Sequence, residues 1–161
     1  MTKRVMTVQE WRATQGTPIP RYDVSEEGII TIHLTPMGKP RQTQRDKWDR
    51  RACVVRYRDL ADRLRAVAKL TGYKLERELY ADFYLPMAKS WPKKKKAEKL
   101  GTEHDQKPDI DNMCKAVMDA LSKEDKAVYR AWGDKYWSEY GKPGKIVLFP
   151  SKAIFLAHRK M

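Results

Sequence analysis

The sequence is organised around one stretch, Lys107-Pro108-Asp109-Ile110-Asp111-Asn112-Met113-Cys114-Lys115, which continues to Asp119-Ala120-Leu121. Proline restricts its own φ and keeps the preceding residue extended, so a stiff loop leads into the two aspartates. Asp111 or Asn112 suits a helix N-cap, because a short polar side chain can accept hydrogen bonds from first-turn amides. Met113, Val117 and Leu121 then recur every four residues, which predicts the buried face of a short helix.

The same predicted helix carries a charged stripe of Asp111, Lys115 and Asp119. Asp109 and Asp111 can both turn toward one point, where two carboxylates repel each other unless a cation lies between them. Mg²⁺, or else Mn²⁺, suits an all-oxygen site, and Lys115 can face a phosphate one turn further on. The alternative is that Asp111 only caps the helix and that Lys115 and Asp119 form only a surface ion pair. Spacing alone does not separate the two interpretations.

The composition indicates one basic domain with a partner of opposite charge. The 161 residues are 41% hydrophobic, which is enough for a real core, and 34 Lys and Arg against 21 Asp and Glu give a net charge of +13. Nucleic acid is the first candidate partner and an anionic membrane surface the second. No apolar run approaches the roughly 18 residues of a membrane span, and no signal peptide is recognisable. The two cysteines lack metal-type spacing, so we expect a reduced, cytoplasmic compartment.

Hydrophobic periodicity predicts an α+β fold, with a small mixed sheet of about four strands packed with two or three helices. Residues 1–27 are expected to form an N-terminal arm, and residues 28–161 a single domain. The predicted strands cover residues 28–35, 78–85, about 127–137 and 145–149. The predicted helices run from about 55 to 71, over a short basic segment after Pro92, and from about 111 to 121.

Basic residues gather in two segments that suit a nucleic-acid backbone. Residues 39–65 are rich in arginine and include Trp48, and residues 93–96 are four consecutive lysines. The alternative for each segment is a solvated basic surface. His104, in the polar loop before the aspartates, is a secondary candidate for a metal or phosphate contact. The candidate nucleic-acid-binding residues are Lys39, Arg41, Arg45, Lys93, Lys94, Lys95, Lys96 and Lys135.

The motif 107–112, with Lys115, Asp119-Ala120-Leu121 and then Glu124-Asp125 before a strand, resembles the RusA family of Holliday-junction resolvases (crossover junction endodeoxyribonucleases). The resemblance covers roughly residues 28–150, and 107–125 is its most specific part. By resemblance, Asp109, Asp111 and Asp125 match the metal-binding carboxylates and Lys115 the catalytic lysine. The family often has two aspartates before the last strand, so Glu124 is a rival to Asp125 as third ligand.

The resemblance implies a small, basic, homodimeric and Mg²⁺-dependent endodeoxyribonuclease, often encoded by a phage or prophage and acting in the bacterial host cytoplasm. Its substrate would be branched DNA, a four-way junction cut by paired phosphodiester hydrolysis in recombination and repair. The residues support the same chemistry, since a bound cation polarises phosphate and water and Lys115 offsets the growing charge. The alternatives are a non-cleaving nucleic-acid-binding module and a metal nuclease for other branched DNA. Carboxylates beside DNA argue against binding alone, because without a cation they repel it.

Overall fold

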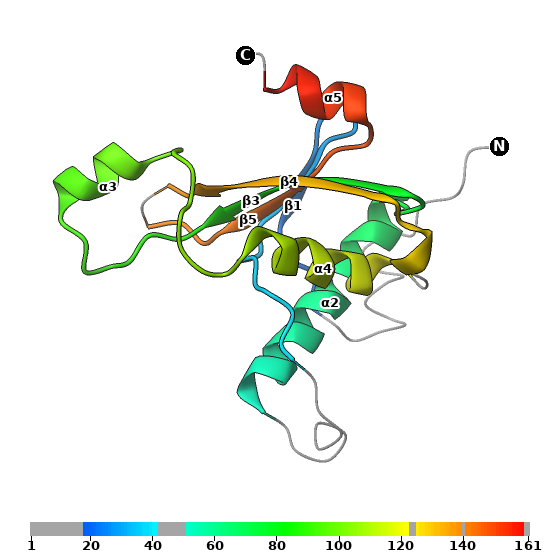
Figure 1. The fold of residues 1–161 in the computed structure, drawn as a ribbon, viewed down its shortest axis with the longest axis horizontal. Coiled ribbons are helices and arrows are strands. Elements are labelled where there is room, and N and C mark those ends of the chain that lie inside the picture. Colours follow the sequence, from blue (N-terminus) through cyan, green and yellow to red (C-terminus); the bar gives the residue numbers. More distant parts are fainter. Residues whose placement is uncertain (1–17, 42–50, 123–124, 140, 160–161) are drawn as a thin grey trace.

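The computed structural model describes residues 18–41, 51–122, 125–139 and 141–159, and these form one mixed sheet with helices on both faces (Figure 1). The predicted α+β class is confirmed, with five strands in place of about four. The elements are β1 (Tyr22–Val24), β2 (Ile30–Ile32), α2 (Ala52–Thr71), β3 (Glu78–Leu85), α3 (Lys93–Lys99), α4 (Ile110–Leu121), the 3₁₀ turn η2 (Asp125–Ala127), β4 (Arg130–Trp137), β5 (Lys145–Leu148) and α5 (Lys152–Ala157).

The sheet has the strand order β1-β2-β5-β3-β4, in which β3 and β4 are parallel and all other neighbours are antiparallel. Parallel neighbours need a long crossover, which here contains α3 and α4. Because α4 runs back against the two strands, its first turn lies toward their carboxyl ends. Ligand sites of open sheets with parallel strands commonly form outside those ends.

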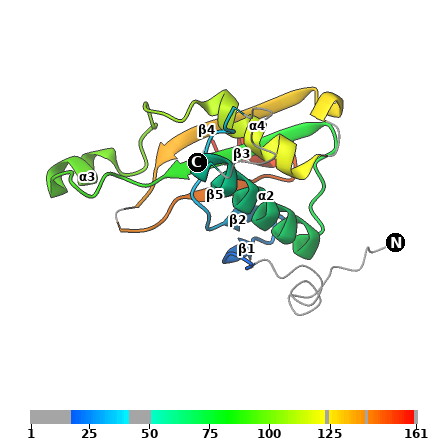
Figure 2. The same ribbon diagram turned by 90° about the horizontal axis from the view of Figure 1, so that it is seen from below.

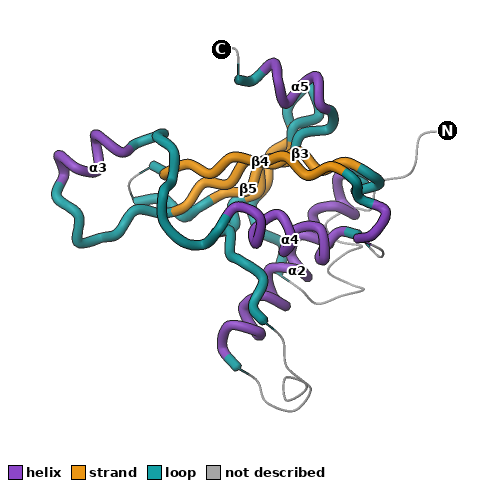
Figure 3. Tube along the Cα trace, in the orientation of Figure 1, coloured by secondary structure: helices purple, strands orange, loops and turns teal. Residues whose placement is uncertain are grey.

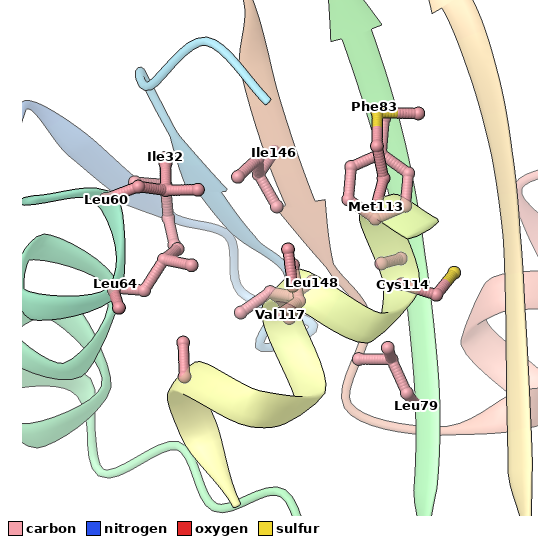
Figure 4. Packing of buried hydrophobic residues seen from close by; sticks show 14 of the residues in the cluster. Ile32, Leu60, Leu64, Leu79, Phe83, Met113, Cys114, Val117, Ile146 and Leu148 are labelled. Carbon is pink, nitrogen blue, oxygen red and sulfur yellow. The ribbon is translucent and has the colours of Figure 1, made fainter. Parts of the chain in front are cut away.

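The main core lies between the sheet and the pair α2 and α4, which pack on each other and lie below the sheet in Figure 1 and in front of it in Figure 2. Leu64 of α2, Met113 and Val117 of α4, and Phe83 and Ile146 of the sheet are almost completely buried there (Figure 4). Helix α2 ends as predicted at Gly72, whose φ of 74° is left-handed. The opposite face of the sheet is covered by α5. The second core cluster, between this face and α5, contains Ile29, Tyr80, Val147, Phe149 and Phe155.

Four elements differ from the sequence-based expectation. Strand β2 covers only residues 30–32 of the predicted 28–35, and β4 begins at Arg130, because residues 125–127 form a 3₁₀ turn. Strand β1 lies within the segment predicted to be an arm and pairs antiparallel with β2. Residues 1–17 of that arm lie outside the described residues, and the division at residue 27 stays a prediction. Helix α5 was not predicted.

The crossover carries α3 away from the sheet on two loops (Figure 3). Aromatic rings pack together where these loops leave and rejoin the sheet. The Trp91 ring centroid lies 4.7 Å, and the His104 ring centroid 4.1 Å, from that of Trp137. The returning loop then follows the outer edge of β4, where the Trp137 amide donates to the Thr102 carbonyl at 2.9 Å. None of the helices in the described parts of the chain is long and apolar enough to cross a membrane.

Candidate active site

The first turn of α4 presents the two aspartates of the central motif. Asp109 is the N-cap, with extended dihedral angles, and its carbonyl accepts the first helical hydrogen bond from the Met113 amide at 3.1 Å. The prediction of a cap at Asp111 or Asn112 was therefore wrong by two or three residues. The Asp109 side chain makes no capping hydrogen bond. Both carboxylates thus lie near the helix N-terminus, whose dipole favours negative charge.

Asp109, Asp111 and Lys115 are all exposed, and none forms an ion pair with another described residue. Asp111 contributes to the electrostatic surroundings of Cys114, where burial first and Asp111 second raise the thiol pKa to about 11. The Cys114 thiol is therefore protonated at neutral pH. The two carboxylates remain without a compensating cation from the described protein.

Asp119 is not paired with Lys115, as the surface ion-pair interpretation required, but with Lys39. The loop after β2 crosses α4 at this place, and the Lys39 amide donates to the Asn112 carbonyl at 3.4 Å. A Cβ atom at Gly38 would lie 2.5 Å from the side-chain Nδ2 of Asn112, so a larger residue there would require the Asn112 side chain to move. Lys39, a predicted DNA contact, thus has a structural partner, and Lys115 extends separately from the exposed side of the helix.

Lys135 of β4 holds the loop that leads into Asp109. Its ammonium donates to the Pro108 carbonyl at 2.9 Å and to the Gln106 carbonyl, while its own carbonyl accepts from the His104 amide at 2.9 Å. Sequence reasoning placed Lys135 among the DNA-binding residues and missed this contact. The sequence around Lys135 does not predict this contact, because its partner Pro108 lies 27 residues away.

Gly133 allows α4 to pack closely on the edge of the sheet. A Cβ atom there would lie 2.8 Å from the Ala81 carbonyl oxygen and 3.3 Å from the Cys114 sulfur. A glycine inside a strand is a recognisable signal for such close approach, although sequence analysis did not use it. Beside this contact lies a cavity of about 510 Å³, which Asp111 lines together with Trp132 and Asp134 of β4.

The Asp125 backbone lies far from the first turn of α4, which carries Asp109 and Asp111. The helix from Asp111 to the C-cap Ser122 is about 16 Å long at 1.5 Å per residue, and Asp125 begins the 3₁₀ turn that follows. That turn leads to Tyr129, whose amide donates to the Arg77 carbonyl before the start of β3. The motif instead lies beside Lys135 at the other end of β4. The structure therefore brings Asp109 and Asp111 together but separates the Asp125 backbone from them.

Glu124, the rival third ligand, lies outside the described residues. Among the described residues, no group of three His, Cys, Asp or Glu side chains is arranged to hold a metal ion. Asp134, which shares the cavity with Asp111, accepts hydrogen bonds from Arg159 Nε at 2.9 Å and Nη2 at 2.7 Å, both at Oδ2. The same Arg159 pairs with buried Asp82, whose carboxyl pKa is raised mainly by burial.

The predicted lysine run divides into an exposed and a buried part. Lys93, Lys94 and Lys95 are exposed on α3, and the Lys95 ammonium lies 4.0 Å from the Trp91 ring centroid. Lys96 is buried, and its ammonium donates to the Lys89 carbonyl at 3.1 Å, so its place is structural. Helical periodicity explains the difference, since the fourth lysine falls on the inward side of the turn.

Three further candidate residues have different surroundings. Arg41 is exposed at the edge of the described loop, and Arg45 lies outside the described residues. His104 is buried against Trp137, its Nδ1 accepts from the Gln106 amide at 3.4 Å, and burial, then Lys135, lowers its pKa. Among the described residues, no contact directs the buried, neutral His104 imidazole toward the carboxylates of Asp109 and Asp111.

A basic α+β domain that presents free carboxylates and a lysine at an exposed helix start has the features of a hydrolase for nucleic-acid phosphodiesters. The family model described as endodeoxyribonuclease RusA matches residues 33–144, and the chain belongs to this family. The family implies Holliday-junction resolvase endonuclease activity and DNA binding in recombination, and its resolvases generally depend on a divalent metal. No curated protein and no solved structure matches the chain.

Proposed function

We propose that this chain resolves Holliday junctions by Mg²⁺-dependent, paired hydrolysis of two phosphodiester bonds. The observation that carries the proposal is the pair Asp109 and Asp111 at the exposed start of α4, with no ion pair to another described residue. Two such carboxylates close to DNA would repel the phosphate backbone without a cation. The non-cleaving binding module is therefore the weaker alternative.

The donor set fits a hard divalent cation, because both side chains offer carboxylate oxygens. When bound, such an ion supplies Lewis-acid activation of the phosphate and of water. Asp109 and Asp111 would hold it, with Mg²⁺ as our proposal and Mn²⁺ as a substitute. Lys115 is exposed one turn after Asp111, so its ammonium can bind a phosphate oxygen and stabilise charge that grows there during hydrolysis.

The sequence-based proposal adds a third carboxylate, Asp125, with Glu124 as its rival. The Asp125 backbone follows the far end of α4, and among the described residues no third carboxylate forms a metal-binding group with Asp109 and Asp111. Asp134 lies on the face of β4 that carries Asp82 and Arg159, opposite to α4. Asp109 and Asp111 alone would therefore hold the cation, and water would fill its other positions, as is usual for Mg²⁺.

For the DNA backbone we propose the exposed residues Arg41, Lys93, Lys94 and Lys95. Ammonium and guanidinium groups at these positions would release counterions from phosphates, which makes binding depend on salt. We also propose a homodimer, because two symmetric nicks in a two-fold junction call for two identical sites. Action in a bacterial host cytoplasm and a phage origin stay predictions.

The proposal is tested by incubating the protein with a synthetic mobile four-way junction, a linear duplex and a flap, each with Mg²⁺ or with EDTA. We expect paired nicks in the junction with Mg²⁺ and none with EDTA. Junction binding without cleavage under every condition would favour the binding module. Preferential cleavage of the flap would favour a nuclease for other branched DNA.

A further inference from the structure

The cavity beside Asp111 continues around the edge of β4 to an exposed tryptophan. Trp132 is 38% exposed, although its register partner Tyr80 is buried on the same face of the sheet. The Tyr80 ring meets it edge-on, with centroids 5.9 Å apart, and the Phe155 ring lies at 6.3 Å. Two aromatic neighbours from the core therefore hold an indole ring that is still partly exposed to solvent.

Two basic side chains lie over this ring. The Lys152 ammonium lies 4.9 Å, and the Arg130 guanidinium carbon 5.5 Å, from the ring centroid. Arg130 is held by an ion pair with Glu78 at 2.7 Å, whereas Lys152 is exposed on the first turn of α5 and its long side chain can move. A base that takes the place of the Lys152 ammonium on the ring would leave both cations free to contact the adjoining phosphates.

The edge of β4 is open at this point. The returning loop forms its described backbone contacts with β4 at residues 135–137 only. Residues 131–134 border the cavity of about 510 Å³, which the absent side chain of Gly133 and the small side chain of Ala131 leave open. A flat group can therefore enter from the edge of the sheet, with Trp132 on one side and α4 with Asp111 on the other.

We propose that this cavity takes an unpaired nucleobase of branched DNA, stacked on Trp132, with adjoining phosphates on Lys152 and Arg130. The inference rests on the proposed function and adds the part of the substrate that the site recognises. A paired base in a duplex has both faces covered by its neighbours and cannot stack on the ring. At a strand exchange point a base can leave the stack, so Trp132 would distinguish a junction from a linear duplex.

The first experiment identifies the contact with photocrosslinking. 5-Iodouracil is placed at successive positions near the crossover of a synthetic junction, and the complex is irradiated in EDTA so that no strand is cut. We expect mass spectrometry to find the crosslink on the peptide that contains Trp132, from one or two positions at the crossover. A crosslink pattern that excludes this peptide at every position would overturn the proposal.

The second experiment measures affinity for the junction and for a linear duplex of the same sequence. Base–aromatic stacking is typically worth enough that Trp132→Ala should weaken junction binding by about five- to one-hundred-fold, with little change for the duplex. Trp132→Phe should retain most of the affinity. Leu156→Ala is the matched control, since Leu156 is equally exposed at 38% on α5 but does not line the cavity.

The outcomes separate this inference from the proposed function. If the wild-type protein cleaves the junction but Trp132→Ala binds it with unchanged affinity, the base pocket is refuted and the nuclease function stands. If the wild-type protein does not bind the junction, both are refuted. Thermal unfolding of each variant shows whether a loss reflects folding, and the wild-type crosslink decides the matter if Trp132→Ala does not fold.

Discussion

Gly133 links the packing of the sheet to the geometry of the candidate site. Its missing side chain lets the Cys114 sulfur approach β4, and it leaves open the cavity that Asp111 lines. The neighbouring residues of β4 have distinct contacts: Trp132 with the second core cluster, Asp134 with Arg159 and Lys135 with the motif loop. A single strand therefore supplies the cavity wall and holds the loop that carries Asp109.

We expect Gly133→Ala to destabilise the protein. The added Cβ would lie 2.8 Å from a backbone oxygen of the neighbouring strand, which cannot move aside like a flexible side chain. Overpacking of this kind typically costs about 1–3 kcal/mol of unfolding free energy. Chemical denaturation measures the change. Gly101→Ala reports the cost of backbone strain alone, because its φ is positive but its Cβ would meet no atom within 4 Å. Unchanged stability of Gly133→Ala would contradict the packing described here.

The third carboxylate gives a second prediction at the level of single residues. Asp134→Asn should keep most of the Mn²⁺ affinity, because Arg159 binds its carboxylate on the sheet face opposite to α4. Asp125→Asn should also keep it, because the Asp125 backbone follows the far end of α4. Mn²⁺ titrations and nicking rates of both variants check the assignment. Loss of metal affinity in Asp125→Asn would return the third ligand to the segment after α4. Loss of activity in Asp134→Asn with normal metal affinity would instead indicate a structural role through Arg159.

At the level of elements, α3 is the clearest candidate for a DNA contact outside the carboxylate site. It lies apart from the sheet, and of its first four lysines three are exposed while the fourth is buried. The exposed lysines are thus available to phosphates, and Lys96 stabilises the attachment of the helix through the Lys89 carbonyl.

Replacing Lys93, Lys94 and Lys95 with alanine should weaken junction binding and reduce its dependence on salt. The slope of log K against log salt should become shallower by about 0.9 for each phosphate that the variant no longer neutralises. Gel-shift titrations at several salt concentrations provide the slope. Lys96→Met is the matched control in the same helix and should lower the melting temperature without changing the slope. An unchanged slope in the triple variant would identify the run as a solvated surface.

The elements themselves could be predicted where the pattern is local. Residues 78–85 alternate cleanly and form β3 over that whole range, and the apolar stripe before Gly72 gives α2. Strand β1 was missed because it has only three residues and is stabilised by pairing with β2. The start of β4 was misplaced because an apolar segment does not by itself distinguish a strand from a 3₁₀ turn.

For the candidate site too, the sequence was informative only where the residues lie close together along the chain. The spacing of Asp109, Asp111 and Lys115 made these three residues candidates, since they belong to one short segment, and their roles stay a prediction. The contacts of Asp119 with Lys39 and of Lys135 with Pro108 join residues from different elements, and no local pattern records them. For the same reason, a single sequence could not show that α4 separates Asp125 from the motif.

At the level of the whole molecule, charge and symmetry lead to a prediction about assembly. The chain carries a net charge of +13, and a four-way junction has two equivalent strands to cut. We expect light scattering in dilute solution to give about twice the monomer mass of 18.9 kDa, and one dimer to bind each junction. A monomeric mass, with one monomer bound per junction, would contradict this assembly.

The most direct measurement of the central claim compares wild-type protein with Asp109→Asn and Asp111→Asn on the same labelled junction. Each substitution removes a negative charge that repels DNA and a ligand of the proposed cation. We therefore predict that nicking with Mg²⁺ is lost in both variants while junction affinity in EDTA is kept or increased. Undiminished nicking by either variant would contradict the assignment of these two aspartates as the metal-binding centre.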